Sequence, residues 1–184
     1  MDQAEIRAII EEGMHLRGWI SNAYAQVEYL LGDLIMQCRA YPIYAEQTAT
    51  FTHSATKRVA KVRTMLNLGG PLAPYAARVG EMLDAFSNNH DTRNLLAHGF
   101  CEFHHTPSGD AGLVFSRFER GGGAENQNED SLVVRTFRLV DLQYHEAQLT
   151  HQSKAALELF TEMYAELGWV RGHLAVIAQG VGGA

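Results

Sequence analysis

The sequence predicts a mainly α-helical bundle that carries a small antiparallel β insertion at about residues 100–140. Three observations support this fold class. Apolar residues recur at helical spacing on both sides of the insertion, whereas within it they alternate with polar residues. Glycine-rich turn segments divide the alternating stretches from one another. Because 184 residues with 46% hydrophobic content suffice for one core, we expect a single domain over residues 1–184.

The first 41 residues are expected to be helical. Asp2 and Glu5 have the spacing of a capping box. Gly13 and Gly18 weaken the middle of the segment, so Ser21 either starts a second helix or lies on a polar face. An apolar stripe at helical spacing then follows: Tyr24, Val27, Leu31, Leu34, Ile35 and Cys38. This pattern predicts a strongly amphipathic helix.

Two further helices are expected before the insertion. One opens at Ser54 or Thr56 and runs to about Leu68, where the sequence GGP stops it. A third, long helix begins at about Leu72 and leads into the polar run SNNHDTRN. Arg93, Asn94 and His98 would therefore lie at the end of a long helix.

The segments FCEFHH, GLVFSRFER and SLVVRTFRLV are expected to form two or three antiparallel strands, joined by turns in PSGDAG and GGGAENQNED. Helical spacing returns from about Asp141 and continues to Leu167. The tail after Leu167 is expected to add a short helix and to end in a flexible, glycine-rich segment at about residues 178–184.

Charge and cysteine content narrow the class of protein. The net charge of −6 disfavours a broad, nonspecific nucleic-acid surface but leaves room for a local one. Cys38 and Cys101 lie far apart and form no CxxC pair, which indicates neither a disulfide framework nor a thiolate zinc site. The chain begins with acids and has no run of 18 apolar residues, so we expect a cytoplasmic protein without a membrane segment.

The stretch DTRNLLAHGF places Arg93, Asn94 and His98 on one predicted helix that ends at Gly99. Asn94 and His98 are four residues apart and share a face, while Arg93 projects about 140° away and is long enough to reach round. Arginine and histidine are also common in the last helical turn, because cations suit its negative end. The motif is therefore either an ordinary helix end or a catalytic group of residues.

These residues, RNLLAH, resemble the RNxxxH form of the R-x4-6-H motif of the HEPN family, and the order of elements over about residues 20–168 loosely resembles its bundle. The resemblance implies a HEPN-like fold and a homodimer. Many members are metal-independent endoribonucleases of toxin–antitoxin and antiviral systems, and others are inactive. Arg93, Asn94 and His98 would be the active-site residues. Phe100 stands where toxins paired with small nucleotidyltransferases carry a tyrosine, and it lacks the hydroxyl that such a partner would modify.

The chemistry of RNA cleavage agrees with this implication. Attack by the 2′-hydroxyl needs a base, an acid and cationic donors for the phosphate, and one histidine cannot be base and acid at once. A two-fold dimer would supply two copies of His98, with Arg93 on the scissile phosphate and Asn94 orienting His98 or contacting the phosphate. No metal or cofactor is expected. The alternative is a non-catalytic HEPN-like module that binds RNA, an antitoxin or another partner protein.

A basic segment is the second feature relevant to RNA. Between Gln47 and Gly80 the chain carries a local charge of +5 and no acidic residue, so the rest of the chain carries −11. The cations are Lys57, Arg58, Lys61, Arg63 and Arg78. The first four are candidates for holding RNA phosphates. A solvated helix face with some paired charges is the alternative.

Other motifs are incomplete. His145 and Glu146 start an HExxH pattern, but the position four residues after His145 is leucine. His104 and His105 would point to opposite faces of a strand and could not bind one ion together. Gly121–Gly123 lacks the lysine and hydroxyl residue of a phosphate loop. We therefore expect no metal site.

Overall fold

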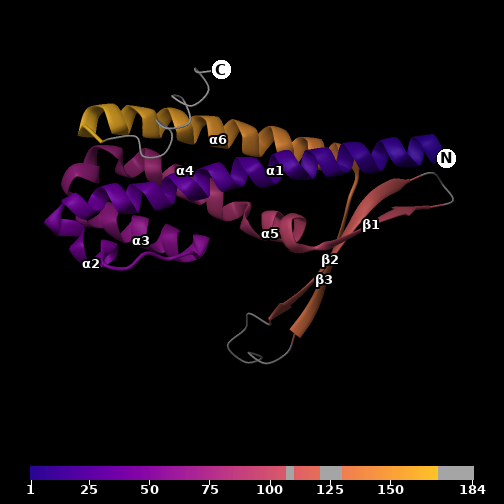
Figure 1. Ribbon diagram of the computed structural model, residues 1–184, viewed down its shortest axis with the longest axis horizontal. Helices are drawn as coiled ribbons and strands as arrows, with labels where there is room; N and C mark the ends of the chain where they lie inside the picture. The colour runs from indigo at the N-terminus through magenta and orange to yellow at the C-terminus, as the bar shows by residue number, and fades with distance from the viewer. Residues whose placement is uncertain (107–109, 121–129, 170–184) are drawn as a thin grey trace, which may run out of the picture. The chain divides into compact units, whose positions relative to one another are not determined.

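The computed structural model describes residues 1–106, 110–120 and 130–169. It is mainly helical and contains a three-stranded antiparallel sheet, as the sequence predicts (Figure 1). The chain divides into two compact units. The sheet unit comprises Met1–Tyr24 and Asn89–His151, and the helical unit comprises Ala25–Asn88 and the described part of Gln152–Ala184. The predicted flexible tail at 178–184 and the glycines at 121–123 lie outside the described residues.

The first helix, α1, spans Gln3–Gln37 without interruption and contributes to both units. Its capping box is confirmed, because Asp2 and Glu5 exchange backbone-to-carboxylate hydrogen bonds of 2.8 and 2.9 Å. The alternative in which Ser21 starts a second helix is wrong, because α1 continues through Gly13, Gly18 and Ser21. Gly13 is buried, and a Cβ there would lie 2.2 Å from Cδ1 of Leu113, so the glycine lets α1 pass close to the sheet. Burial of Leu16 and Ile20, which follow Gly13 on the same helix, compensates for its low helix propensity.

The sheet has the order β1 (Phe100–His105), β2 (Ala111–Arg120) and β3 (Asp130–Phe137), so of the two or three predicted strands three are present. β1 pairs with the first half of β2, and β3 pairs with Leu113–Arg120. The β2–β3 ribbon therefore continues past the end of β1.

The two faces of the sheet differ in burial. One face buries Leu113, Phe115 and Phe137 in the core of the sheet unit. By the register, the opposite face carries four exposed apolar side chains, with 68% of Phe100, 76% of Phe118, 55% of Leu132 and 52% of Val134 accessible to solvent. Glu102 and His104 lie on the same face and are exposed too, so the alternation predicted from the sequence produces an exposed face with both apolar and polar side chains.

The helical unit contains two longer helices, α3 (Ala55–Leu68) and α4 (Ala76–Asn88). Short helical elements precede and separate them: η1 (Cys38–Ala40), η2 (Pro42–Tyr44), α2 (Ala45–Thr48) and η3 (Gly70–Tyr75). Of the two predicted helix starts, Ser54 and not Thr56 caps α3, because the Ser54 hydroxyl accepts a hydrogen bond from the Lys57 backbone N–H. Gly69 and Gly70 then adopt φ angles of 76° and 65°, which residues with a side chain rarely adopt, and end α3.

The long helix predicted from Leu72 to the motif is wrong. Residues 70–75 form a 3-10 helix that contains Pro74, and α4 starts only at Ala76. α4 ends at Asn88, because Asn89 leaves the helical region with φ −98° and ψ 1°. The motif lies instead on its own nine-residue helix, α5 (His90–His98).

The last predicted helix is confirmed as α6 (Leu139–Leu167), which starts two residues earlier than expected. The Asp141 carboxylate accepts hydrogen bonds from the backbone N–H and the guanidinium of Arg138. These contacts lower the pKa of Asp141 and raise that of Arg138. No helix in the described part of the chain has the length and apolarity needed to span a membrane.

Candidate functional site

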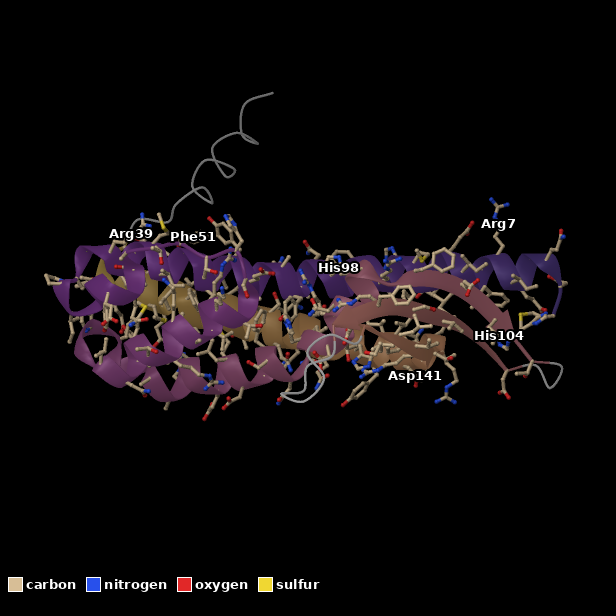
Figure 2. All side chains as sticks on the ribbon, turned by 90° about the horizontal axis from the view of Figure 1, so that it is seen from below. Arg7, Arg39, Phe51, His98, His104 and Asp141 are labelled. Carbon is tan, nitrogen blue, oxygen red and sulfur yellow. The ribbon has the colours of Figure 1, made fainter. Side chains whose placement is uncertain are left out.

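Arg93, Asn94 and His98 all lie on α5 in the sheet unit. Leu95 and Leu96 anchor this helix in the core, with at most 1% of either residue exposed. Arg93 and Asn94 are partly buried, whereas His98 is exposed in the last turn, where α5 leads into β1 (Figure 2). The short helix therefore presents a sheltered pair and an accessible imidazole.

The structure brings Arg93 and Asn94 together. One guanidinium nitrogen of Arg93, Nη1, donates a 3.0 Å hydrogen bond to Oδ1 of Asn94. The guanidinium carbon also lies 4.8 Å from the centre of the Tyr24 ring on α1, within the range of a cation–π interaction. Two elements of the sheet unit thus hold the cation.

His90 completes this group, and sequence analysis missed it. Its Nε2 lies 2.8 Å from Nδ2 of Asn94, and its Nδ1 lies 2.8 Å from the hydroxyl of Tyr24. A signal was present, because His90, Asn94 and His98 follow one another at intervals of four residues and so share one helix face. Tyr24 gave no such signal, since it is 66 residues from His90 and reads as a core residue.

Arg17 of α1 holds the C-terminal end of α5. Its Nε donates to the carbonyl of Leu96 at 2.5 Å, and its Nη2 donates to the carbonyls of Ala97 and Gly99 at 3.3 and 3.4 Å. The guanidinium also lies over the Phe115 ring, 5.3 Å from its centre. A cation on these carbonyls stabilises the negative end of the helix dipole. Arg17 therefore fixes the turn that carries His98.

Gly99 follows α5 because the backbone comes close at this position. Its φ of −73° and ψ of 142° are extended, so no left-handed conformation is required. A Cβ at this position would lie 2.4 Å from the carbonyl oxygen of Leu95. The close approach of the backbone, which also gives a 2.7 Å hydrogen bond from Gly99 to Leu95, selects glycine here.

His98 differs from the rest of the group. Among the described residues its side chain makes no hydrogen bond or ion pair, and the contacts of Asn94 are with Arg93 and His90. Asn94 therefore does not orient His98 within this chain. The imidazole of His98 is accessible to a molecule approaching from solvent.

The candidate RNA-binding residues Lys57, Arg58, Lys61 and Arg63 lie on α3 in the helical unit, and three of them have internal partners. Arg58 donates to the backbone carbonyls of Thr52 and Glu28 and lies over the Phe51 ring, which Figure 2 labels.

Lys61 donates to the carbonyls of Gln47 and Thr50, and Arg63 pairs with Asp84 at 2.5 Å. The side chain of Lys57 is exposed. Three of the four candidate cations therefore already bind groups within the helical unit.

The remaining candidate metal-binding side chains do not lie close together in the described part of the chain. In the part of the chain that the structure describes, no three His, Cys, Asp or Glu side chains lie close enough to hold a metal ion. His104 and His105 are exposed on β1. Cys38 and Cys101 are free thiols, and burial raises the pKa of both, that of Cys38 to about 12.

No protein-family model, curated protein or solved structure matched the chain.

Proposed function

We propose that this protein is a metal-independent endoribonuclease of HEPN type, acting as a toxin or as a stress or defence effector. The main observation in support is the arrangement on α5, where the Arg93–Asn94 pair is held in place and an accessible His98 lies on the same short helix. A fixed guanidinium suits a phosphate, and an exposed imidazole suits proton transfer.

The reaction uses these groups as follows. The 2′-oxygen attacks the adjacent phosphorus as a base removes its proton, and the bond to the 5′-oxygen breaks as an acid protonates that oxygen. The products are a 2′,3′-cyclic phosphate and a 5′-hydroxyl. His98 is the base or the acid, and Arg93 neutralises charge on the phosphate, with Asn94 as a further donor. Two histidines are required, so His98 of a second copy completes the site.

The exposed face of the sheet supports a second copy as the partner. Its two phenylalanines, Phe100 and Phe118, together expose on the order of 300 Å² of apolar surface. Leu132 and Val134 enlarge this patch, which would form the apolar core of an interface of about 800 Å² per protomer. A two-stranded ribbon is marginally stable in water, so covering the β2–β3 ribbon would also stabilise it.

Incubating the purified protein with transfer and messenger RNA in EDTA tests the activity. The wild type is expected to cleave and to leave 2′,3′-cyclic phosphate ends, whereas His98→Ala and Arg93→Ala are expected to lose about 100-fold or more in rate. His104→Ala and Arg7→Ala serve as matched controls, because both residues are exposed and lie outside the α5 group. Cleavage that persists in His98→Ala would refute the assignment.

The alternative function is a non-catalytic HEPN-like module that binds RNA or a partner protein. The internal contacts of Arg93 and the capping of α5 by Arg17 favour it, since they also serve simply to hold the helix. RNA binding without cleavage across varied RNAs would support this module. Lys57, Arg58, Lys61 and Arg63 stay candidates for phosphate contacts in either case.

A further inference from the structure

The hydrogen bonds of Asn94 determine which way its amide points. Oδ1 faces the guanidinium of Arg93, which can only donate, so Oδ1 is the acceptor. Nδ2 therefore faces His90 and donates to its Nε2. An amide turned by 180° would place a donor against the Arg93 guanidinium, and the hydrogen bond between Arg93 and Asn94 would be lost.

The same contacts determine the proton position on His90. Because Nε2 accepts from Asn94, the imidazole is neutral and carries its proton on Nδ1. Nδ1 then donates to the hydroxyl oxygen of Tyr24, 2.8 Å away. Tyr24 has no exposed surface, so it is a fixed anchor beneath the group rather than a group that meets substrate.

Tyr24 therefore acts on Arg93 twice. Its ring lies under the guanidinium, and its hydroxyl holds His90, which holds Asn94, which in turn holds Arg93. We propose that His90 is a positioning residue, which as the Nδ1–H tautomer orients the Asn94 amide and thereby fixes Arg93 for its anionic ligand. The effect on catalysis rests on the proposed ribonuclease function, whereas the tautomer and the amide orientation do not.

Nitrogen NMR of the folded protein tests the geometry without any activity. A long-range proton–nitrogen correlation spectrum at about pH 8, well above the ordinary pKa of imidazole, is expected to show His90 as the Nδ1–H tautomer. The Asn94 side-chain amide is expected to exchange slowly in the wild type and faster in His90→Ala. An Nε2–H tautomer, or Asn94 exchange that does not change in His90→Ala, would overturn the proposal.

Conservative variants separate positioning from mere folding. Gln at position 90 places an amide oxygen near the Nε2 position and keeps the acceptor for Asn94, whereas Asn is too short to reach it. His90→Ala and His90→Asn are expected to lower kcat/KM for RNA by about 10- to 100-fold, because a misplaced Arg93 costs orientation. His90→Gln is expected to retain most of the activity, with the slow Asn94 exchange preserved.

Each variant is first checked for a wild-type circular dichroism spectrum and thermal midpoint, and Asn94 exchange provides a second readout where RNA cleavage is low. Equal loss of cleavage in His90→Gln and His90→Asn would refute the positioning role. A wild type that cleaves no RNA would refute the proposed function alone, because the tautomer and the Asn94 exchange still decide the role of His90.

Discussion

At the scale of single residues, His145 shows how burial changes a titrating group. It lies on α6 between the rings of Phe137 and Tyr144, with ring centres 5.9 and 5.8 Å away. Its Nδ1 is buried and has no hydrogen-bond partner among the described residues. Burial lowers the pKa of His145 below the ordinary 6.5, and the nearby carboxylate of Asp141 partly opposes the shift.

This lowered pKa predicts a pH dependence of stability. The folded state binds fewer protons at His145 than the unfolded state. The contribution of neutral His145 to the unfolding free energy is therefore complete above pH 6.5 and is lost as the pH falls below that value. His145→Asn is expected to lose less unfolding free energy than the wild type between about pH 8 and about pH 5. Urea unfolding of both proteins at the two pH values measures this difference in unfolding free energy.

The control for this experiment is His104→Asn, at an exposed position of β1. It is expected to keep the wild-type pH dependence, because an exposed side chain is not desolvated on folding. An equal pH dependence in wild type and His145→Asn would contradict the assignment.

At the scale of elements, α5 depends on contacts made by α1. A nine-residue helix is too short to be stable alone in water. Leu95 and Leu96 bury one side of α5, Tyr24 contacts His90 and Arg93 in its first turn, and Arg17 caps its C-terminal end. Positions of the candidate functional groups are thus decided by a neighbouring helix.

Arg17→Met tests the cap. Met retains much of the apolar stem but removes hydrogen bonds to three backbone carbonyls, so a loss of about 1–3 kcal/mol in unfolding free energy is expected. The matched control is Arg7→Met on the same helix, which removes an exposed pair with Glu11 and is expected to cost at most about 0.5 kcal/mol. Urea denaturation compares the two variants, and equal losses would show that Arg17 is not a cap.

At the scale of the whole molecule, contacts within one chain leave the apolar side chains on the exposed sheet face uncovered. Phe118 pairs directly with Leu132, and Phe100 and Val134 flank the same β2 residue, Ser116. Contiguous apolar patches of this kind are typical of interaction surfaces. A second copy is the partner that the proposed two-histidine chemistry requires.

Phe118→Ser combined with Leu132→Ser is expected to convert a dimer to a monomer, because both substitutions remove apolar area from the centre of the patch. Size-exclusion chromatography with light scattering measures the mass, and RNA cleavage should fall with the dimer. Leu68→Ser, at an exposed end of α3, is the control and should remain dimeric. A wild type that is monomeric at micromolar concentration would contradict the composite site.

Local signals predicted much of the secondary structure. Asp2 and Glu5 mark the start of α1, Ser54 marks α3, and the alternating segments became three strands. These signals depend on hydrogen bonds and spacing within a few residues, which the sequence displays directly. The break at Asn89 was missed, because a polar run within a helical pattern does not reveal the residue at which the backbone leaves the helix.

The candidate site was predicted in part. Arg93, Asn94 and His98 could be chosen from six consecutive residues, but the group around them uses His90, Tyr24 and Arg17. Arg17 and Tyr24 lie 66 or more residues from their partners on α5. Residue spacing carries no information on such contacts, since they depend on how α1 packs against α5.

The sequence by itself determined the helical class, the strands and the placement of an arginine, an amide and a histidine on one helix, because each follows from periodicity and local hydrogen bonding. Only the tertiary structure decided that α5 stands apart from α4, that Gly13 is a contact with the sheet, and that His90 and Tyr24 hold the Arg93–Asn94 pair. The physical reason is that burial and hydrogen bonding between distant segments select one arrangement among many that the local pattern allows.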